Sequence, residues 1–234
     1  MTGEITYDVQ GRSYTGHLAR PSATKPSAAV LVIHGGGGLG AQAKQRADRL
    51  AQAGYVAFAP DLFGEPVHGV EHAHALVREF TEDWEMLRAR CRAGLELLCN
   101  QPDVDARRLA AIGFCFGGQA ALELGRSGAE LGAIVGFHSQ LATRRPEDSA
   151  RIKARVLVCL GDQDCFVARA DRDVFMENMT ASHVDCQLLL FSGVGHSFTD
   201  PFAEASGVPG LKYDAKADRR AWAAMLALFA EAFE

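Results

Sequence analysis

The sequence lacks several features that mark special classes of protein. No apolar run approaches the roughly 20 residues of a membrane-spanning helix. Residues 1–16 have neither the basic start nor the apolar stretch of a signal peptide. The net charge is only −5, and charges of both signs are interspersed. We therefore expect a globular protein without an export signal, and neither nucleic acid nor a membrane surface as its partner.

Cysteine is present, but not in the usual structural patterns. None of the 6 cysteines forms a CxxC pair, and none stands with histidine at the spacing of a zinc site. In a chain without an export signal, we expect free thiols. Five of them are expected to be small apolar packing residues. The exception is Cys115, because of its surroundings in the sequence.

Apolar segments alternate with amphipathic ones along the 234 residues. The short apolar runs predict strands buried on both faces, at 27–34, 55–63, 108–114, 132–138, 154–161 and 186–191. Helical spacing occurs at 41–54, 70–80, 82–99, 116–125, 168–180 and 214–233, and residues 5–19 predict an antiparallel hairpin. This order predicts an α/β fold in a single domain, 1–234, with a mostly parallel central sheet between two layers of helices.

The segment Gly113-Phe114-Cys115-Phe116-Gly117-Gly118 joins a predicted strand to a predicted helix. It matches the G-x-nucleophile-x-G turn, with Cys where Ser is commoner. Such a turn is so tight that the positions two before and two after the nucleophile have little room for side chains. The start of a helix also favours a thiolate, and the N–H of Phe116 would face a developing oxyanion. The alternative is a glycine-rich turn with a structural cysteine.

An acid and a histidine follow Cys115 in the chain order that is typical of α/β-hydrolases. The strand at 154–161 leads into Asp162 and Asp164, and the strand at 186–191 is followed by His196. Both loops are expected at the carboxyl edge of the sheet, where open α/β sheets bind ligands. Asp162 is expected to cap its turn, which favours Asp164, although position alone leaves both open. His196 would then activate Cys115, and the acid would orient His196.

A run of four glycines follows His34 at the end of the first buried strand. It is similar to the HGGG-type loop of esterases, and glycine lets backbone N–H groups face a substrate. We expect the amide of Gly36 to complete an oxyanion hole with that of Phe116. The alternative, a phosphate-binding loop, lacks both the GK[ST] and the GxGxxG pattern.

Together, GFCFGG, GDQD and GHSF resemble the dienelactone hydrolase family of α/β-hydrolases, as do YVAFAPDLFGE and YDAKADRRAW. The resemblance extends from about Ser27 to the end of the chain. It implies the α/β-hydrolase fold, no metal, no organic cofactor, a cytoplasmic setting, and a small-molecule ester or lactone as substrate. It assigns Cys115 as nucleophile, Asp164 as acid and His196 as base; the oligomeric state, monomer or homodimer, stays open.

Two positions depart from the family pattern. Gly35 stands where a Glu commonly follows the histidine, and Asp200 stands where dienelactone-cleaving members have an Arg that binds the substrate carboxylate. An aspartate repels a carboxylate, so we predict neutral ester substrates. The expected substrate-binding residues are Gly35, Phe63, Trp84, Phe137, His138 and Phe198.

Three other functions fit parts of the pattern. A phosphotriesterase could use the same three residues, because an oxyanion hole also suits a phosphoryl oxygen. A thiol-based redox sensor could link Cys115 to Cys165. A binding protein without activity is the third, but such proteins typically lose the nucleophile or the base.

Overall fold

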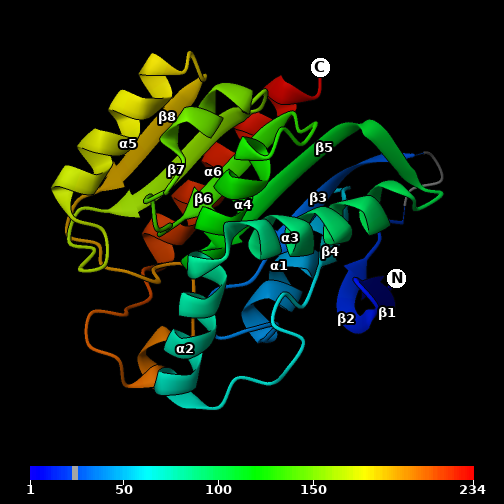
Figure 1. The fold of residues 1–234 in the computed structure, drawn as a ribbon, viewed down its shortest axis with the longest axis horizontal. Helices are drawn as coiled ribbons and strands as arrows, with labels where there is room; N and C mark the ends of the chain where they lie inside the picture. The colour runs from blue at the N-terminus through cyan, green and yellow to red at the C-terminus, as the bar shows by residue number, and fades with distance from the viewer. Residues whose placement is uncertain (23–25) are drawn as a thin grey trace.

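The computed structural model describes residues 1–22 and 26–234, and these form one eight-stranded sheet in the order β1-β2-β4-β3-β5-β6-β7-β8 (Figure 1). The strands from β3 to β8 are parallel, and β1 and β2 join this sheet antiparallel at one edge. Their bounds are Thr2–Val9 (β1), Arg12–Ala19 (β2), Ser27–Ile33 (β3), Val56–Ala59 (β4), Val104–Phe114 (β5), Ala133–Phe137 (β6), Arg155–Gly161 (β7) and Cys186–Phe191 (β8).

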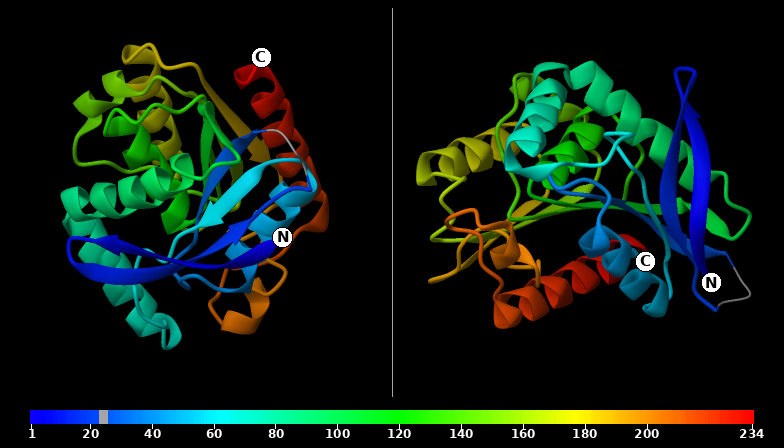
Figure 2. Two further views of the ribbon diagram at one scale, coloured as in Figure 1. Left: turned by 90° about the vertical axis from the view of Figure 1, so that its right-hand side faces the viewer. Right: turned by 90° about the horizontal axis from the view of Figure 1, so that it is seen from below.

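Helices cover both faces of the sheet, which gives the predicted three-layer sandwich. The helices are α1 (Ala41–Gln52), α2 (Gly69–Glu82), α3 (Trp84–Cys99), α4 (Phe116–Arg126), α5 (Arg169–Ala181) and α6 (Ala215–Ala232). Figure 2 shows α1 and α6 on one face and α3, α4 and α5 on the other. Each face encloses its own apolar core, and β3, buried along its whole length, contributes side chains to both.

The sequence predicted each α-helix and strand of the described residues, but some bounds differ. The segment 55–63 forms a strand only over Val56–Ala59, and β5 begins earlier than predicted, at Val104. Two short 3-10 helices, η1 (Pro146–Arg151) and η2 (Ala203–Ser206), were not predicted. Helix α2 projects beyond the sheet (Figure 1). In the described ranges, no helix is long and apolar enough to cross a membrane.

Buried charges brace the helix that follows Cys115. Glu123 of α4 is fully buried and accepts hydrogen bonds from Arg88 of α3 and Arg126 of α4. Arg88 also donates to Asp148 of η1. Two positive and two negative side chains therefore lie together out of water, and each ion depends on its partners for stabilisation.

Candidate active site

Cys115 lies between the end of β5 and the start of α4 with a backbone conformation that L-residues rarely adopt. Its φ is 54° and its ψ is −119°. A backbone held in such a region stores strain, and the surroundings must impose it. Here they do so through hydrogen bonds, because the Cys115 N–H donates to the carbonyl of Phe137 at 3.0 Å and its carbonyl accepts from Gly118 at 3.1 Å. The strained turn lifts the side chain away from the helix and into a cavity.

The glycines around Cys115 are required by space. A Cβ at Gly113 would overlap the carbonyl of Gly117, and a Cβ at Gly117 would overlap the carbonyl of Ile33. At Gly118 it would meet the side chain of Ser139 at about 2.5 Å. The close packing of β5, α4 and β3 around the turn therefore follows from these positions, as their spacing predicted.

Asp164 and His196 meet at the carboxyl ends of β7 and β8. The Nδ1 of His196 donates to Oδ2 of Asp164 at 2.8 Å, and Oδ1 of Asp164 accepts from the N–H of Phe166 at 2.9 Å. Asp162 instead accepts from the N–H of Gly193 at 2.6 Å and so caps the neighbouring turn. Of the two acids that the sequence left open, Asp164 is the one in contact with the histidine.

His196 also reaches the sulfur of Cys115, and the two groups shift each other's pKa. Burial alone would raise the pKa of Cys115, but it is lowered because the thiolate accepts hydrogen bonds from His196 and from the backbone N–H groups of Phe116 and Gly36. Burial alone would lower the pKa of His196, but its bonds to Asp164 and Cys115 raise it to about 10. These contacts therefore favour transfer of the Cys115 proton to His196, toward a thiolate–imidazolium pair.

Neighbouring rings shield His196 from water. The ring of His196 lies edge-on to that of His138, with centroids 5.0 Å apart, and the ring of Phe166 is 4.8 Å away. His196 is only 2% exposed. His138 is itself buried, and burial together with the nearby charge of His196 holds its pKa well below the usual value. His138 is therefore neutral and does not compete for the negative charge of Cys115.

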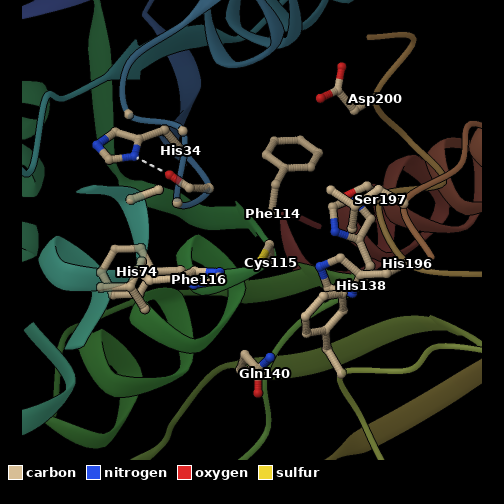
Figure 3. Close-up of a pocket in the computed structure, with 18 of the residues that line it drawn as sticks. His34, His74, Phe114, Cys115, Phe116, His138, Gln140, His196, Ser197 and Asp200 are labelled. Carbon is tan, nitrogen blue, oxygen red and sulfur yellow. Dashed lines mark hydrogen bonds between the residues drawn. The ribbon is translucent and has the colours of Figure 1, made fainter. Parts of the chain in front are cut away.

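His34 orients the glycine loop. Its Nε2 lies 3.0 Å from the N–H of Leu62, which can only donate, so the ring proton is on Nδ1. That Nδ1–H donates to the carbonyl of Gly35 at 2.7 Å (Figure 3). In a planar trans peptide the C=O and the next N–H point in opposite directions. Holding the Gly35 carbonyl toward His34 therefore aims the N–H of Gly36 the other way, at Cys115.

These groups open into a cavity of about 960 Å³. Its walls come from the glycine loop, from α2, from the segment after β6 and from residues 197–211. Of the predicted substrate-binding residues, Gly35, Trp84 and His138 line it. Phe63, Phe137 and Phe198 instead pack in the core behind it, where their rings contact Phe116, Phe114 and His138.

Several lining residues were not predicted. Phe166, Gln119 and Gln140 belong to them, and so does Asp200, which the sequence marked only as a departure from the family. Gln119 stands one helical turn after Cys115, a spacing that could have revealed it. Cys165, the second thiol in the alternative of a redox sensor, is exposed and packs against Gly210.

A strand–turn–helix carrying a nucleophile, with an acid and a histidine after later strands of the same sheet, defines an α/β-hydrolase. Comparison with known proteins narrows the class. The sequence profile of the Dienelactone hydrolase family matches residues 14–233. The chain therefore belongs to the dienelactone hydrolase family and is a hydrolase that acts on a small molecule.

Individual relatives agree with this assignment. The solved structure of m3DLH is 42% identical, with a TM-score of 0.96, and the match covers 100% of this chain and 99% of that one. A dienelactone hydrolase-like promiscuous phosphotriesterase from metagenomic libraries is 37% identical over 99% of this chain and 98% of its own, with a TM-score of 0.94. A protein of Bradyrhizobium sp. named "Probable 2-oxo-3-(5-oxofuran-2-ylidene)propanoate lactonase" is 29% identical over 213 residues, which is 86% of this chain and 85% of the relative.

Proposed function

We propose that the chain is a single-domain, cysteine-dependent hydrolase of carboxylic esters or lactones, in which Cys115, His196 and Asp164 form the catalytic triad. The observation that carries the proposal is the set of contacts on one sulfur atom. The thiol of Cys115 lies within reach of His196, which is held by Asp164, and of the two amides of Phe116 and Gly36; His196 and both amides lower its pKa. A base and two oxyanion donors thus surround one nucleophile.

The reaction would proceed in two halves. The Cys115 thiolate attacks the ester carbonyl carbon, and the carbonyl oxygen accepts hydrogen bonds from the N–H groups of Gly36 and Phe116. His196 gives its proton to the leaving alcohol as the carbon–oxygen bond breaks, which leaves an acyl-thioester. His196, now neutral, removes a proton from water, whose oxygen attacks the thioester and releases the acid and the thiolate. Asp164 keeps the imidazole oriented in both halves.

We further propose that neutral esters are preferred over carboxylated lactones. Asp200 lines the cavity on the His196 side of Cys115 (Figure 3). A substrate carboxylate would be repelled there. We place the enzyme in the cytoplasm, as the family resemblance implied; its oligomeric state, monomer or homodimer, stays a prediction.

Phosphotriester hydrolysis is a second candidate activity. It is favoured by the 37% identity and TM-score of 0.94 to the promiscuous phosphotriesterase. In this chain, the same thiolate would attack phosphorus, and the amides of Gly36 and Phe116 would bind the phosphoryl oxygen.

The test is a hydrolysis panel on the wild type, Cys115→Ala and the control Cys165→Ala, which removes an exposed thiol outside the cavity lining. The substrates are a neutral aryl ester, a carboxylated dienelactone and an aryl phosphotriester. We expect the neutral ester to have the highest kcat/KM, the Cys115 variant to lose at least a thousandfold, and the control to keep its activity. Full activity in Cys115→Ala would reject the mechanism, and a preference for the carboxylated lactone would reject the role of Asp200.

A further inference from the structure

Gln119 is an amide on the cavity wall whose nitrogen is hydrogen-bonded to the protein and whose oxygen is not. It lies on α4, one turn after Cys115, and is only 5% exposed. Its Nε2 donates to the carbonyl of Ala142 at 2.7 Å. A carbonyl accepts but does not donate, so this bond fixes which end of the amide is nitrogen.

The oxygen of the same amide is left for a ligand. Among residues 1–22 and 26–234, no donor lies within hydrogen-bonding distance of Gln119 Oε1. The side chain lines the cavity, and its nitrogen is tied to the segment after β6, so the oxygen faces the open space. The oxygen is not sealed inside the protein, so a ligand that enters the cavity can reach it. An apolar group placed against it would shield it from water without a donor, at a cost of about 1–3 kcal/mol, whereas a ligand hydroxyl would pair with it.

A second amide lies on the same part of the wall. Gln140 lines the cavity, and its backbone N–H donates to the carbonyl of Cys115 at 3.4 Å. This bond holds the segment after β6 against the start of α4. Its side chain makes no hydrogen bond within the described residues. In Figure 3 it lies on the opposite side of Cys115 from Asp200. Two amides therefore mark one side of the nucleophile, and an acid marks the other.

The proposed reaction decides which part of a substrate lies on the amide side. His196 must protonate the leaving oxygen, so the alcohol part extends toward His196, on the side of Asp200. The acyl part then extends along α4, where the apolar side chains of Val77, Trp84 and Phe116 also line the cavity. This placement rests on the proposed function.

We propose that Gln119, with Gln140 beside it, selects substrates whose acyl part carries a hydroxyl group. The hydroxyl donates to Gln119 Oε1, and the amide of Gln140, free to donate or accept, pairs with the same hydroxyl. The substrate class is thus narrowed to hydroxyacyl esters and hydroxylated lactones. Apolar acyl chains fill the same space but leave the Gln119 oxygen without a donor.

A matched pair of esters tests this, 4-nitrophenyl butanoate and 4-nitrophenyl 3-hydroxybutanoate, which share the leaving group and differ by one hydroxyl. The wild type is expected to favour the hydroxylated ester by about three- to tenfold in kcat/KM, as one neutral hydrogen bond of about 0.5–1.5 kcal/mol allows. Gln119→Met keeps the length of the side chain, and its ratio is expected to fall to about one. Gln42→Met, at another cavity-lining glutamine, is the control and should keep the wild-type ratio.

The outcomes separate this inference from the proposed function. If Gln119→Met lowers kcat/KM equally for both esters, Gln119 only supports Ala142 and the inference is wrong. If the variant does not fold, the wild type alone is measured with the 2-, 3- and 4-hydroxybutanoate esters of 4-nitrophenol. The inference is wrong if none of them has a higher kcat/KM than 4-nitrophenyl butanoate. Hydrolysis that survives Cys115→Ala would instead overturn the proposed function, whatever the ratio.

Discussion

His34 makes two hydrogen bonds with different consequences, and two substitutions separate them. Nδ1 holds the carbonyl of Gly35, which aims the Gly36 amide at Cys115, and Nε2 accepts from the N–H of Leu62. The side-chain amide of Asn reaches about as far as Nδ1, and that of Gln about as far as Nε2. His34→Asn therefore keeps the bond to Gly35 and loses the one to Leu62, while His34→Gln does the reverse.

The expected magnitudes differ accordingly. Removing one oxyanion donor costs about 10²–10³ in kcat. In His34→Gln, the carbonyl of Gly35 still accepts from the N–H of Gly38 at 3.1 Å, so the peptide keeps part of its orientation. We therefore expect kcat to fall by about ten- to a hundredfold, or about 1.4–2.7 kcal/mol. In His34→Asn, the fully buried Leu62 loses its acceptor, and the free energy of unfolding should fall by about 1–3 kcal/mol.

The assay combines steady-state hydrolysis of a neutral aryl ester with urea unfolding of the wild type and both variants. His34→Gln is expected to have a low kcat and nearly the free energy of unfolding of the wild type. His34→Asn is expected to keep kcat within about threefold of the wild type but to unfold at a lower urea concentration. Equal kcat in the two variants would refute the claim that His34 orients the oxyanion loop, because only one of them can donate to Gly35.

Three further changes test other parts of the site. Because His196 lowers the pKa of Cys115, alkylation of Cys115 by iodoacetamide should reach half of its plateau rate at a lower pH than a free thiol does, below roughly pH 8.5, whereas in His196→Gln the midpoint should rise to that pH or above because burial alone raises the pKa; peptide mass spectrometry measures both, and equal midpoints would contradict the pairing. Asp200→Arg should raise the kcat/KM ratio of a carboxylated lactone to a neutral ester by about tenfold, with Asp200→Asn in between, and an unchanged ratio would remove Asp200 from the specificity argument. Glu123→Gln leaves two buried arginines facing one carboxylate, so urea unfolding should show a loss of about 3–5 kcal/mol, and a loss below about 1 kcal/mol would mean that the cluster is not a brace.

The parts of the site that sequence could predict are those set by local geometry. The glycines at 113 and 117 follow from a turn with no room for side chains, and the structure has their hypothetical Cβ atoms overlapping backbone. Asp162 was expected to cap its turn, and it does so through Gly193. In each case, the reason lies within a few residues of the strand end.

The cavity wall was harder to predict, because it depends on how distant segments pack. Phe137 ends a strand beside the site, but its ring stacks on Phe114 in the core at 5.1 Å. Phe63 stacks on Phe116 in the same way, at 5.6 Å. An aromatic residue near a catalytic loop looks the same in sequence whether it faces the core or the cavity. Which side it faces depends on tertiary packing, and here Phe63 and Phe137 belong to the two apolar cores on opposite faces of the sheet.

The central claim is that Cys115 becomes acylated during turnover, and trapping that intermediate tests it directly. The wild type is mixed with a 4-nitrophenyl ester, quenched in acid within the first turnovers, digested and analysed by mass spectrometry. We expect the acyl mass on the peptide that contains Cys115, a 4-nitrophenol burst of about one equivalent when deacylation is slow, and neither signal in Cys115→Ala. An acyl group on another residue, or turnover without any acylated peptide together with an active Cys115→Ala variant, would contradict it.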